Sequence, residues 1–331
     1  MAIIFIDGFD HYVTAEIDRK WTSQSGAAIV SSPVLRAGSK SLEINNSADF
    51  ASLALPSAMT TIVFGAAFLY TAVPASHDGI VFRNGTTAQV SIAVTATGAI
   101  AAYRGTTAGT QLCISAAGVI PINTRVYIEA KVVFHDSTGS VEIRVNGAAV
   151  ATASGVDTQQ VSSGADVFRI GGGSFAHYWD DLFIDDADFK GDCRVDVLMP
   201  NGAGATTEWA PSAGSNYQNV DDDGDSDDDT TYNSEDTAGQ IDTYTVPDIE
   251  ATGGAIHAVA VNMAVRKDDV GARTVKGVIR QATTNYSSGT ALTVFDSYRV
   301  SQAIWATQPD SSGAWDETDL NAAEFGIEME A

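Results

Sequence analysis

The sequence predicts an all-β protein, and three observations support this. Short β-branched or alternating runs recur about every 8 to 14 residues, the spacing typical of β-sandwiches. Clusters of Gly, Asn, Asp and Ser, which favour turns, separate these runs. No stretch of useful length shows the apolar period of an amphipathic helix. With 44% hydrophobic residues, the chain has enough apolar material to build real cores.

Residues 1–190 are expected to form the first domain. The Gly-bearing loop Asp136-Ser137-Thr138-Gly139 lies between two β-rich runs and predicts a hairpin. Asn146-Gly147 predicts a second tight turn into residues 148–152. The other candidate strands are 3–6, 61–70, 80–83, 89–95, 99–103, 111–114, 125–135, 141–146, 167–171 and 178–185.

A change of composition near residues 190–194 marks the expected start of a second, smaller β-sandwich at 194–331. One strand is expected at 194–199, followed by a polar loop at about 200–240 that holds the acidic run 221–229. Strands are then expected at 241–246, 255–266, 273–281, 292–298 and 325–329.

The charge excludes two classes of partner. Lys plus Arg number 18 against 42 Asp plus Glu, so the net charge is -24. Such a surface disfavours nucleic acid, which requires a cationic face, and disfavours anionic membranes for the same reason. The opening Met1-Ala2-Ile3-Ile4-Phe5-Ile6-Asp7 predicts a strand rather than a signal peptide, and no apolar run is long enough to span a bilayer. We therefore expect a protein made in the cytoplasm, with no membrane insertion.

No catalytic residues are predicted. A Glu-x-Asp-x-x-Glu array, typical of glycosidases on β-sandwiches, is missing, and the nearest fragment is Glu16-Ile17-Asp18. There is no Gly-x-Ser-x-Gly motif, the five histidines lack zinc spacing, and Cys113 and Cys193 lie in no motif. The chain is therefore expected not to be an enzyme and to need no cofactor, with calcium as the one metal to consider.

The calcium hypothesis concerns the acidic run. Asn219, Asp221 and Asp223 match the first oxygen ligands of a calcium loop, Gly224 follows them, and Asp227 falls at the ninth position. However, Thr230 occupies the twelfth position, where a Glu is expected, and no helices flank the loop. A solvated acidic loop without a metal is the alternative, because neighbouring aspartates repel one another.

Tyr178, Trp179, Asp180 and Asp181 form the candidate glycan-binding group. Exposed aromatic rings beside carboxylates bind sugars by stacking and hydrogen bonding. A tryptophan in the core of a sandwich is the alternative. The pairs Asp180-Asp181 and Asp185-Asp186 also flank the apolar run 182–184, where they either bind calcium or end the strand.

Residues 123–185 resemble the C-terminal half of a laminin G-like or concanavalin A-like jelly roll. The matching segments are TRVYIEAKV at 124–132, GSVEIRVNG at 139–147, FRIGG at 168–172 and WDDLFI at 179–184. The resemblance implies an N-terminal jelly-roll sandwich and leaves function open.

Other short motifs resemble segments of tailed-bacteriophage virion proteins. They are DGFDHY at 7–12, KW at 20–21, WAPSAGSNY at 209–217, DTTY at 229–232 and WDETDLNAAEFGI at 315–327. The resemblance implies a non-enzymatic protein of the virion, most simply a tail-fibre or tail-tip component for host attachment. It would work as a homo-oligomer, with a trimer favoured, bound to other virion proteins and to a host-surface glycan. A head-decoration or head-fibre protein is the alternative, and a glycan-processing enzyme is disfavoured by the missing acid array.

Overall fold

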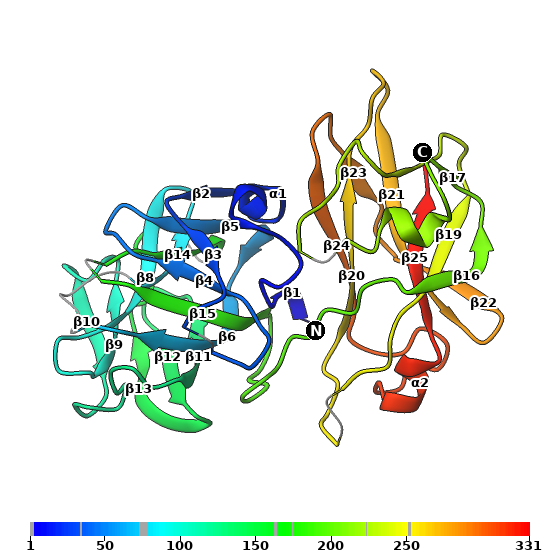
Figure 1. Cartoon of the computed structure of the whole chain (residues 1–331). Coiled ribbons are helices and arrows are strands. Elements are labelled where there is room, and N and C mark those ends of the chain that lie inside the picture. The colour runs from blue at the N-terminus through cyan, green and yellow to red at the C-terminus, as the bar shows by residue number, and fades with distance from the viewer. Residues whose placement is uncertain are drawn as a thin grey trace. The chain divides into compact units, whose positions relative to one another are not determined.

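The computed structural model describes residues 3–33, 35–72, 79–161, 164–173, 175–222, 224–250 and 253–331. The chain divides into two compact units, Met1–Val195 and Asp196–Ala331, so the boundary falls just after the expected junction. Strands account for 48% of the chain and helices for 5%, which confirms the all-β fold class (Figure 1). Within the described ranges, no helix is long and apolar enough to cross a membrane.

Unit 1 is a sandwich of two antiparallel sheets. The order in the first sheet is β13 (Ala148–Val156), β12 (Gly139–Val145), β11 (Val126–Val133), β6 (Thr61–Tyr70), β15 (His177–Asp185), β4 (Ser41–Ile44) and β3 (Ala28–Val30), with β1 (Ile3–Asp7) paired to β15. The order in the second sheet is β10 (Thr110–Ile114), β9 (Ile100–Arg104), β8 (Thr87–Val94), β7 (Ile80–Asn84), β14 (Ala165–Gly171), β5 (Phe50–Met59) and β2 (Ser23–Ser25). The short helices η1 (Thr14–Glu16) and α1 (Ile17–Lys20) follow β1.

The two sheets pack through aromatic side chains. Phe64 of β6 lies 6.1 Å from Phe82 and 5.8 Å from Phe168, ring centroid to ring centroid, and both partners belong to the second sheet. The opposite face of β6 is buried too, in a smaller cluster that includes Val63, Tyr127 and Phe183. Burial on both faces explains why β6 is a continuous apolar run in the sequence.

The second apolar cluster is covered by the segment 186–195, which we call the strap. Phe189 and Cys193 of the strap pack against this cluster. The prediction of a strand at 194–199 is wrong, because neither the strap nor residues 196–201 contain a helix or a strand. Both cysteines are free, Cys113 buried and Cys193 half-buried.

Four early strands, β2 to β5, were not among those expected from the sequence. β5 is the longest of them and contains Pro56. A proline normally argues against a strand, because it cannot donate a ladder hydrogen bond. Here Ala54 pairs with Val167 and Met59 with Ala165, so the intervening residues bulge out of register and accommodate the proline.

Unit 2 is the smaller sandwich. Its main sheet runs β16 (Gly202–Thr207), β19 (Ile241–Thr245), β25 (Glu324–Met329), β21 (Arg273–Gln281) and β22 (Thr284–Ser287), with β23 (Leu292–Val294) on β21. A two-stranded sheet of β20 (Val259–Val265) and β24 (Arg299–Trp305) also contributes to its apolar core, where Met263 and Ala303 meet Val275, Ile327 and Trp315. The remaining elements are β17 (Ala210–Pro211), η2 (Asn216–Asn219), β18 (Asn233–Ser234) and α2 (Glu317–Asn321).

The polar tract at 200–240 is more ordered than a loop. It contributes β16 to the main sheet and forms the small β17–β18 pair. Asp242 of β19 is fully buried, and its carboxylate accepts hydrogen bonds from the Trp209 amide, Asn216 Nδ2 and the Tyr244 hydroxyl at 3.0, 2.6 and 2.9 Å. The buried carboxylate of Asp242 thus binds the polar tract to β19 by hydrogen bonds, in a segment that has few apolar side chains to bury.

Candidate functional site

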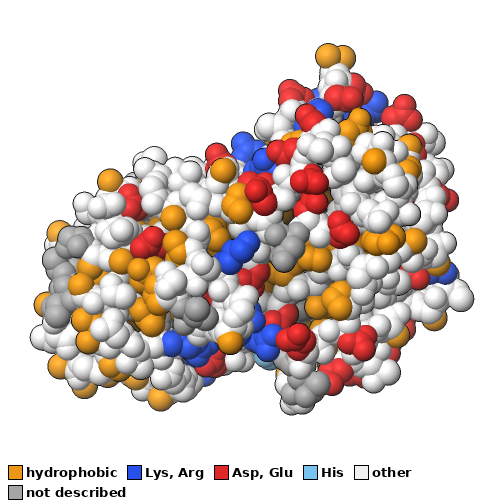
Figure 2. All heavy atoms as spheres, in the orientation of Figure 1, with side chains coloured by type: hydrophobic (Ala, Val, Ile, Leu, Met, Phe, Trp, Pro, Cys, Tyr) orange, Lys and Arg blue, Asp and Glu red, His pale blue; other side chains and the backbone are white. Residues whose placement is uncertain are grey.

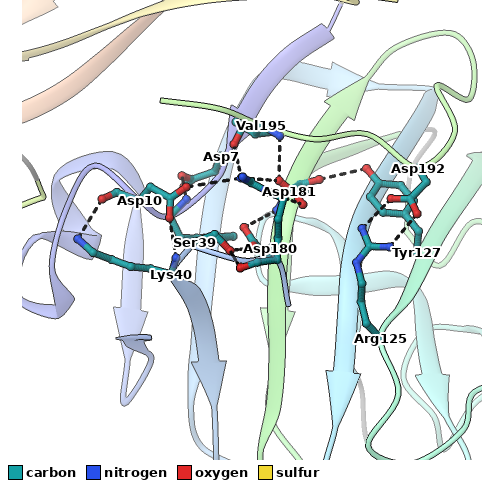
Figure 3. Close-up of polar contacts among 12 residues, drawn as sticks. Asp7, Asp10, Ser39, Lys40, Arg125, Tyr127, Asp180, Asp181, Asp192 and Val195 are labelled. Carbon is teal, nitrogen blue, oxygen red and sulfur yellow. Dashed lines mark hydrogen bonds and ion pairs between the residues drawn. The ribbon is translucent and has the colours of Figure 1, made fainter. Parts of the chain in front are cut away.

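The predicted glycan-binding group lies on β15, in the interior of unit 1. All nine residues of β15 are buried, and the strand lies between β6 and β4 with β1 alongside. Its pairing with β6 is interrupted between Asp180 and Phe183, and Asp181 has a φ of 50°. This bulge lets the neighbouring Asp180 and Asp181 both meet polar partners, as Figure 3 shows.

Tyr178 and Trp179 are not surface rings. They are 7% and 2% exposed, so of the two interpretations of these rings the structure has the core one. Trp179 packs 4.5 Å from Phe68 between ring centroids, and its Nε1 donates to His177 Nδ1 at 2.8 Å. The cavity that Trp179 lines has room for about 10 Å³, roughly one water. Glycan contact by these residues stays a prediction, and in this structure neither ring offers a stacking surface.

Arg36 is the cation opposite Asp181. Its Nη2 lies 3.2 Å from Asp181 Oδ1 and donates to the Val195 carbonyl at 2.8 Å. Asp181 Oδ1 also accepts the Val195 amide at 2.8 Å, and Asp10 lies 3.7 Å from Arg36. Arginine and aspartate together therefore bind both backbone groups of Val195 and fix the end of the strap (Figure 3).

The surroundings of Asp180 favour the neutral form of its carboxyl group. Ser39 Oγ lies 2.9 Å from the Arg36 carbonyl oxygen and 2.7 Å from Asp180 Oδ2. The Ser39 hydroxyl has one proton, so it can donate to only one of these two acceptors at a time. Burial, and then the charge of Asp181, raise the pKa of Asp180 to about 8. Burial raises the pKa of Asp181 as well, while the Val195 amide and Arg36 act against this rise and favour the ionised form.

Asp10 completes this acidic group. Its Oδ1 accepts the Lys40 amide at 2.6 Å, and its carbonyl oxygen accepts from Lys40 Nζ at 2.9 Å. Burial raises the pKa of Asp10 to about 6. An acid and a carboxylate side by side could in principle exchange protons with a substrate, but Asp180 and Asp181 are 0% and 1% exposed. In the structure both carboxyl groups bond to other groups of unit 1.

The strap is bound along its length by side chains of the first sheet. Glu129 Oε1 accepts the amides of Lys190 and Gly191, both at 2.9 Å. Arg125 holds Asp192 with two hydrogen bonds of 2.7 Å. The strap has no neighbouring strand, so the Glu129 side chain provides the hydrogen-bond acceptor that its backbone amides need.

Asp185, the last residue of β15, binds the start of the strap. Its Oδ1 accepts the amides of Ala187 and Asp188 at 2.7 and 3.0 Å, and its Oδ2 lies 3.1 Å from Lys190 Nζ. The acidic pairs around β15 were expected either to bind calcium or to end the strand. In the structure, Asp185 is the last residue of the strand.

A second buried group unites the residues of the N-terminal motifs. Asp7 Oδ2 accepts from the Tyr12 hydroxyl at 2.7 Å and from Trp21 Nε1 at 2.9 Å. Asp7 Oδ1 accepts the Phe9 amide at 3.0 Å and lies 3.2 Å from Lys20 Nζ. DGFDHY and KW thus meet in one place, which we call the Asp7 node, and there they join β1 to α1.

The candidate calcium residues do not converge in the described structure. Asn219 is buried, and its Nδ2 donates to Asn233 Oδ1 at 2.9 Å. Asp221 and Asp227 are exposed, and Asp223 lies outside the described residues. Among those described, no three His, Cys, Asp or Glu side chains gather in a way that could hold a metal. Calcium binding by this loop stays a prediction.

Sequence reasoning missed Arg36, Ser39 and Glu129. Arg36 and Ser39 are separated from their partners on β15 by 145 and 141 residues, and Glu129 from the strap by more than 60. The sequence analysis named the residues of the Asp7 node only within the motifs DGFDHY and KW, and assigned them no contacts. These residues are Asp7, Tyr12, Lys20 and Trp21.

No protein-family model and no curated protein matches the chain. Solved structures similar to it include the alginate lyase vAL-1 from Chlorella virus, at 10% identity and a TM-score of 0.39 over 53% of this chain and 96% of that one. A Bacillus subtilis protein with a galectin-like fold matches at 9% and 0.38, over 57% and 98%. The Caenorhabditis elegans galectin LEC-6 matches at 17% and 0.30, over 43% and 95%. The likeness is one of β-sandwich fold, and it gives no support to a phage virion protein in particular.

Proposed function

We propose that the chain is a non-enzymatic structural protein of a tailed-phage virion, acting in the tail fibre or tail tip during host attachment. The proposal that the chain is not an enzyme rests on the contacts of the paired carboxyl groups on β15. Asp180 bonds to Ser39, and Asp181 bonds to Arg36 and the strap, so both groups stabilise unit 1. The virion part rests on the resemblance of the short motifs.

The Asp7 node supports a structural reading of those motifs. A shared motif whose central carboxylate bonds to other side chains of the same motifs points to a shared fold rather than to a shared reaction. Tyr12 and Trp21 are buried and donate to the same oxygen of Asp7. The motif therefore agrees with a scaffold role for unit 1 in a virion appendage.

The proposed assembly is a homo-oligomer, with a trimer favoured, attached to other virion proteins and presented to a host-surface glycan. Repeated copies strengthen weak single contacts, as attachment requires. The charge of -24 on each copy opposes close packing unless acidic segments stay peripheral. On the face drawn in Figure 2, acidic side chains lie spread among uncharged ones.

Antibody labelling of virus particles tests the proposal. Particles produced from the genome that encodes the chain are treated with gold-labelled antibody against the purified protein and imaged. We expect gold on the tail. Gold on the head would favour the decoration or head-fibre alternative, and unlabelled particles that lack the protein by mass spectrometry would contradict a virion role altogether.

The absence of activity is tested separately. The purified chain is incubated with host capsule and cell-wall polysaccharides, and reducing ends and unsaturated products are measured. We expect no turnover. Turnover that a single Asp or Glu substitution abolishes would show an enzyme, whereas binding to the same polysaccharides without turnover would support glycan recognition.

A further inference from the structure

The Asp7 node brings an amine and a carboxyl group together in a dry interior. Asp7 is 0% exposed, and the side chain of Lys20 is 2% exposed. Lys20 Nζ lies 3.2 Å from Asp7 Oδ1, and 5.3 Å from the centre of the Phe5 ring. Holding two reactive groups in contact and away from water removes much of the barrier to a reaction between them.

The second oxygen of Asp7 is bonded in the way that a reacting carboxyl group needs. When an amine attacks a carboxyl carbon, negative charge gathers on the oxygen that stays. Tyr12 Oη and Trp21 Nε1 donate to Asp7 Oδ2 at 2.7 and 2.9 Å, within the range that stabilises such charge. Neither donor has to move for this.

An imidazole lies next to the amine. His11 Nε2 is 3.3 Å from Lys20 Nζ. Burial, followed by the charge of Lys20, lowers the pKa of His11 to about 3, so the ring is neutral and one of its nitrogens accepts a proton. Burial also lowers the pKa of Lys20, which favours the neutral, nucleophilic amine. Burial of Asp7 is outweighed by Lys20 and its other partners, which lower the pKa of Asp7, so the neutral amine and acid are the minor form from which the reaction starts.

We propose that Lys20 and Asp7 condense into an amide that links their side chains. The ammonium proton passes to the carboxylate, and Nζ attacks Cγ while Tyr12 and Trp21 hold Oδ2. His11 takes a proton from the nitrogen and returns it to Oδ1. The bond from Cγ to Nζ forms, the bond from Cγ to Oδ1 breaks, and one water leaves. No oxidant, reductant or further reactant is needed, because an ammonium and a carboxylate become an amide and water.

The surroundings of the Asp7 node distinguish it from the other lysine–carboxylate contacts of unit 1. Lys190 lies 3.1 Å from Asp185, but its side chain is 21% exposed. Lys131 lies 3.7 Å from Asp188, whose side chain is 74% exposed. Water competes for both of these pairs, so they serve as internal controls that stay ordinary ion pairs.

Intact mass spectrometry of the purified full chain tests the inference. We expect a mass about 18 Da below that of the sequence, the loss of one water. After denaturation and trypsin digestion, the peptide that begins at Lys20 should remain joined to the peptide 1–19, which contains Asp7. A folded protein with the full sequence mass would overturn the proposal.

Variants separate this link from other losses of water. Lys20→Arg keeps the charge but lacks the primary amine, and should have its full mass. Asp7→Asn should lose about 17 Da instead, because ammonia leaves in place of water. Lys190→Arg, the control, should still show the loss of about 18 Da. Because Asp7 precedes Gly8, a cyclic imide of the backbone would give the same mass, and a loss that persists in Lys20→Arg with unbranched peptides would overturn the proposal.

Discussion

The aspartates of β15 and those of the run 221–229 are the same residue type under opposite conditions. Asp180 and Asp181 are buried, each with partners at fixed distances. Asp221 and Asp227 are exposed to water among other acids. The comparison shows that the carboxylates of the chain differ in role: those on β15 organise the fold, Asp229 at the end of the run forms an ion pair with Arg266, and exposed acids such as Asp221 act mainly through screened repulsion.

Removing the cation of the buried group should have the largest effect. Arg36→Met leaves Asp181 buried without its bonded arginine, so we expect the free energy of unfolding to fall by about 3–5 kcal/mol. Urea unfolding measures this. Arg36→Lys, which keeps the charge but loses the two-pronged geometry, should lie between the variant and the wild type. A loss below about 1 kcal/mol for Arg36→Met would contradict the central place given to this ion pair.

The protonated state of Asp180 should appear as a pH dependence. The unfolded chain ionises this group near its ordinary pKa of 3.8, and the folded chain does so at about 8. Between these values the folded state holds the extra proton, so stability should fall as the pH rises, by up to about 1.4 kcal/mol per unit. Asp10, with a pKa of about 6, contributes in the same direction at the acidic end of this window.

Asp180→Asn is the matched variant for that pH series. An amide donates to Ser39 and accepts from the Asp181 amide as the neutral acid does, and it does not ionise. We expect wild-type stability at about pH 5 and a flatter profile up to about pH 9, measured by thermal melts. Parallel profiles for the two proteins would show that Asp180 is ionised in the folded state.

Substitutions that weaken the binding of the strap should reduce stability by an intermediate amount. Glu129→Ala leaves the partly buried amides of Lys190 and Gly191 without their charged acceptor, which we expect to cost about 1–3 kcal/mol. Glu129→Gln keeps an acceptor oxygen and should lose less. Hydrogen exchange at the two amides is the measurement, and unchanged protection in Glu129→Ala would show that the strap does not depend on this residue.

The exposed run should give the smallest change. Asp225→Asn removes one repelling charge, so we expect stability to change by no more than about 0.5 kcal/mol, upward, with the gain lost in high salt. Melts with and without calcium extend this test. If calcium raises the melting temperature and Asp221→Asn abolishes this rise, the loop binds calcium. The alternative of a solvated loop without a metal would then be wrong.

The sequence predicted the bounds of two strands to the residue: β6, a continuous apolar run, and β21, in which apolar and polar residues are mixed. The bounds expected for 61–70 and 273–281 are those of β6 and β21. It failed at 194–199, where Val195 alternates with polar residues like a strand but bonds to Asp181 and Arg36 instead of a neighbouring strand. Local pattern cannot tell these cases apart, because the partners lie far away in the sequence.

The candidate glycan-binding residues were considered as surface groups, whereas the structure places all four in the interior. Tyr178 to Asp181 do form a dense polar and aromatic group, yet they face inward because β15 is covered on both sides. Period-two alternation, the usual sign of a half-exposed strand, is absent from WDDLFI. The acids within that run reflect the bulge at Asp181, which depends on the register with β6.

The strap also determines where a protease can enter. Trypsin cleaves after Lys190 and Arg194, and both bonds lie in the irregular segment that composition marks as the linker. The amides on the far side of these bonds are those of Gly191 and Val195, which donate to Glu129 and Asp181. A protease must draw ten or so residues of extended chain into its own cleft, and here that chain is already bound to a sheet. The segment that looks most open to nicking is therefore protected for as long as unit 1 stays folded.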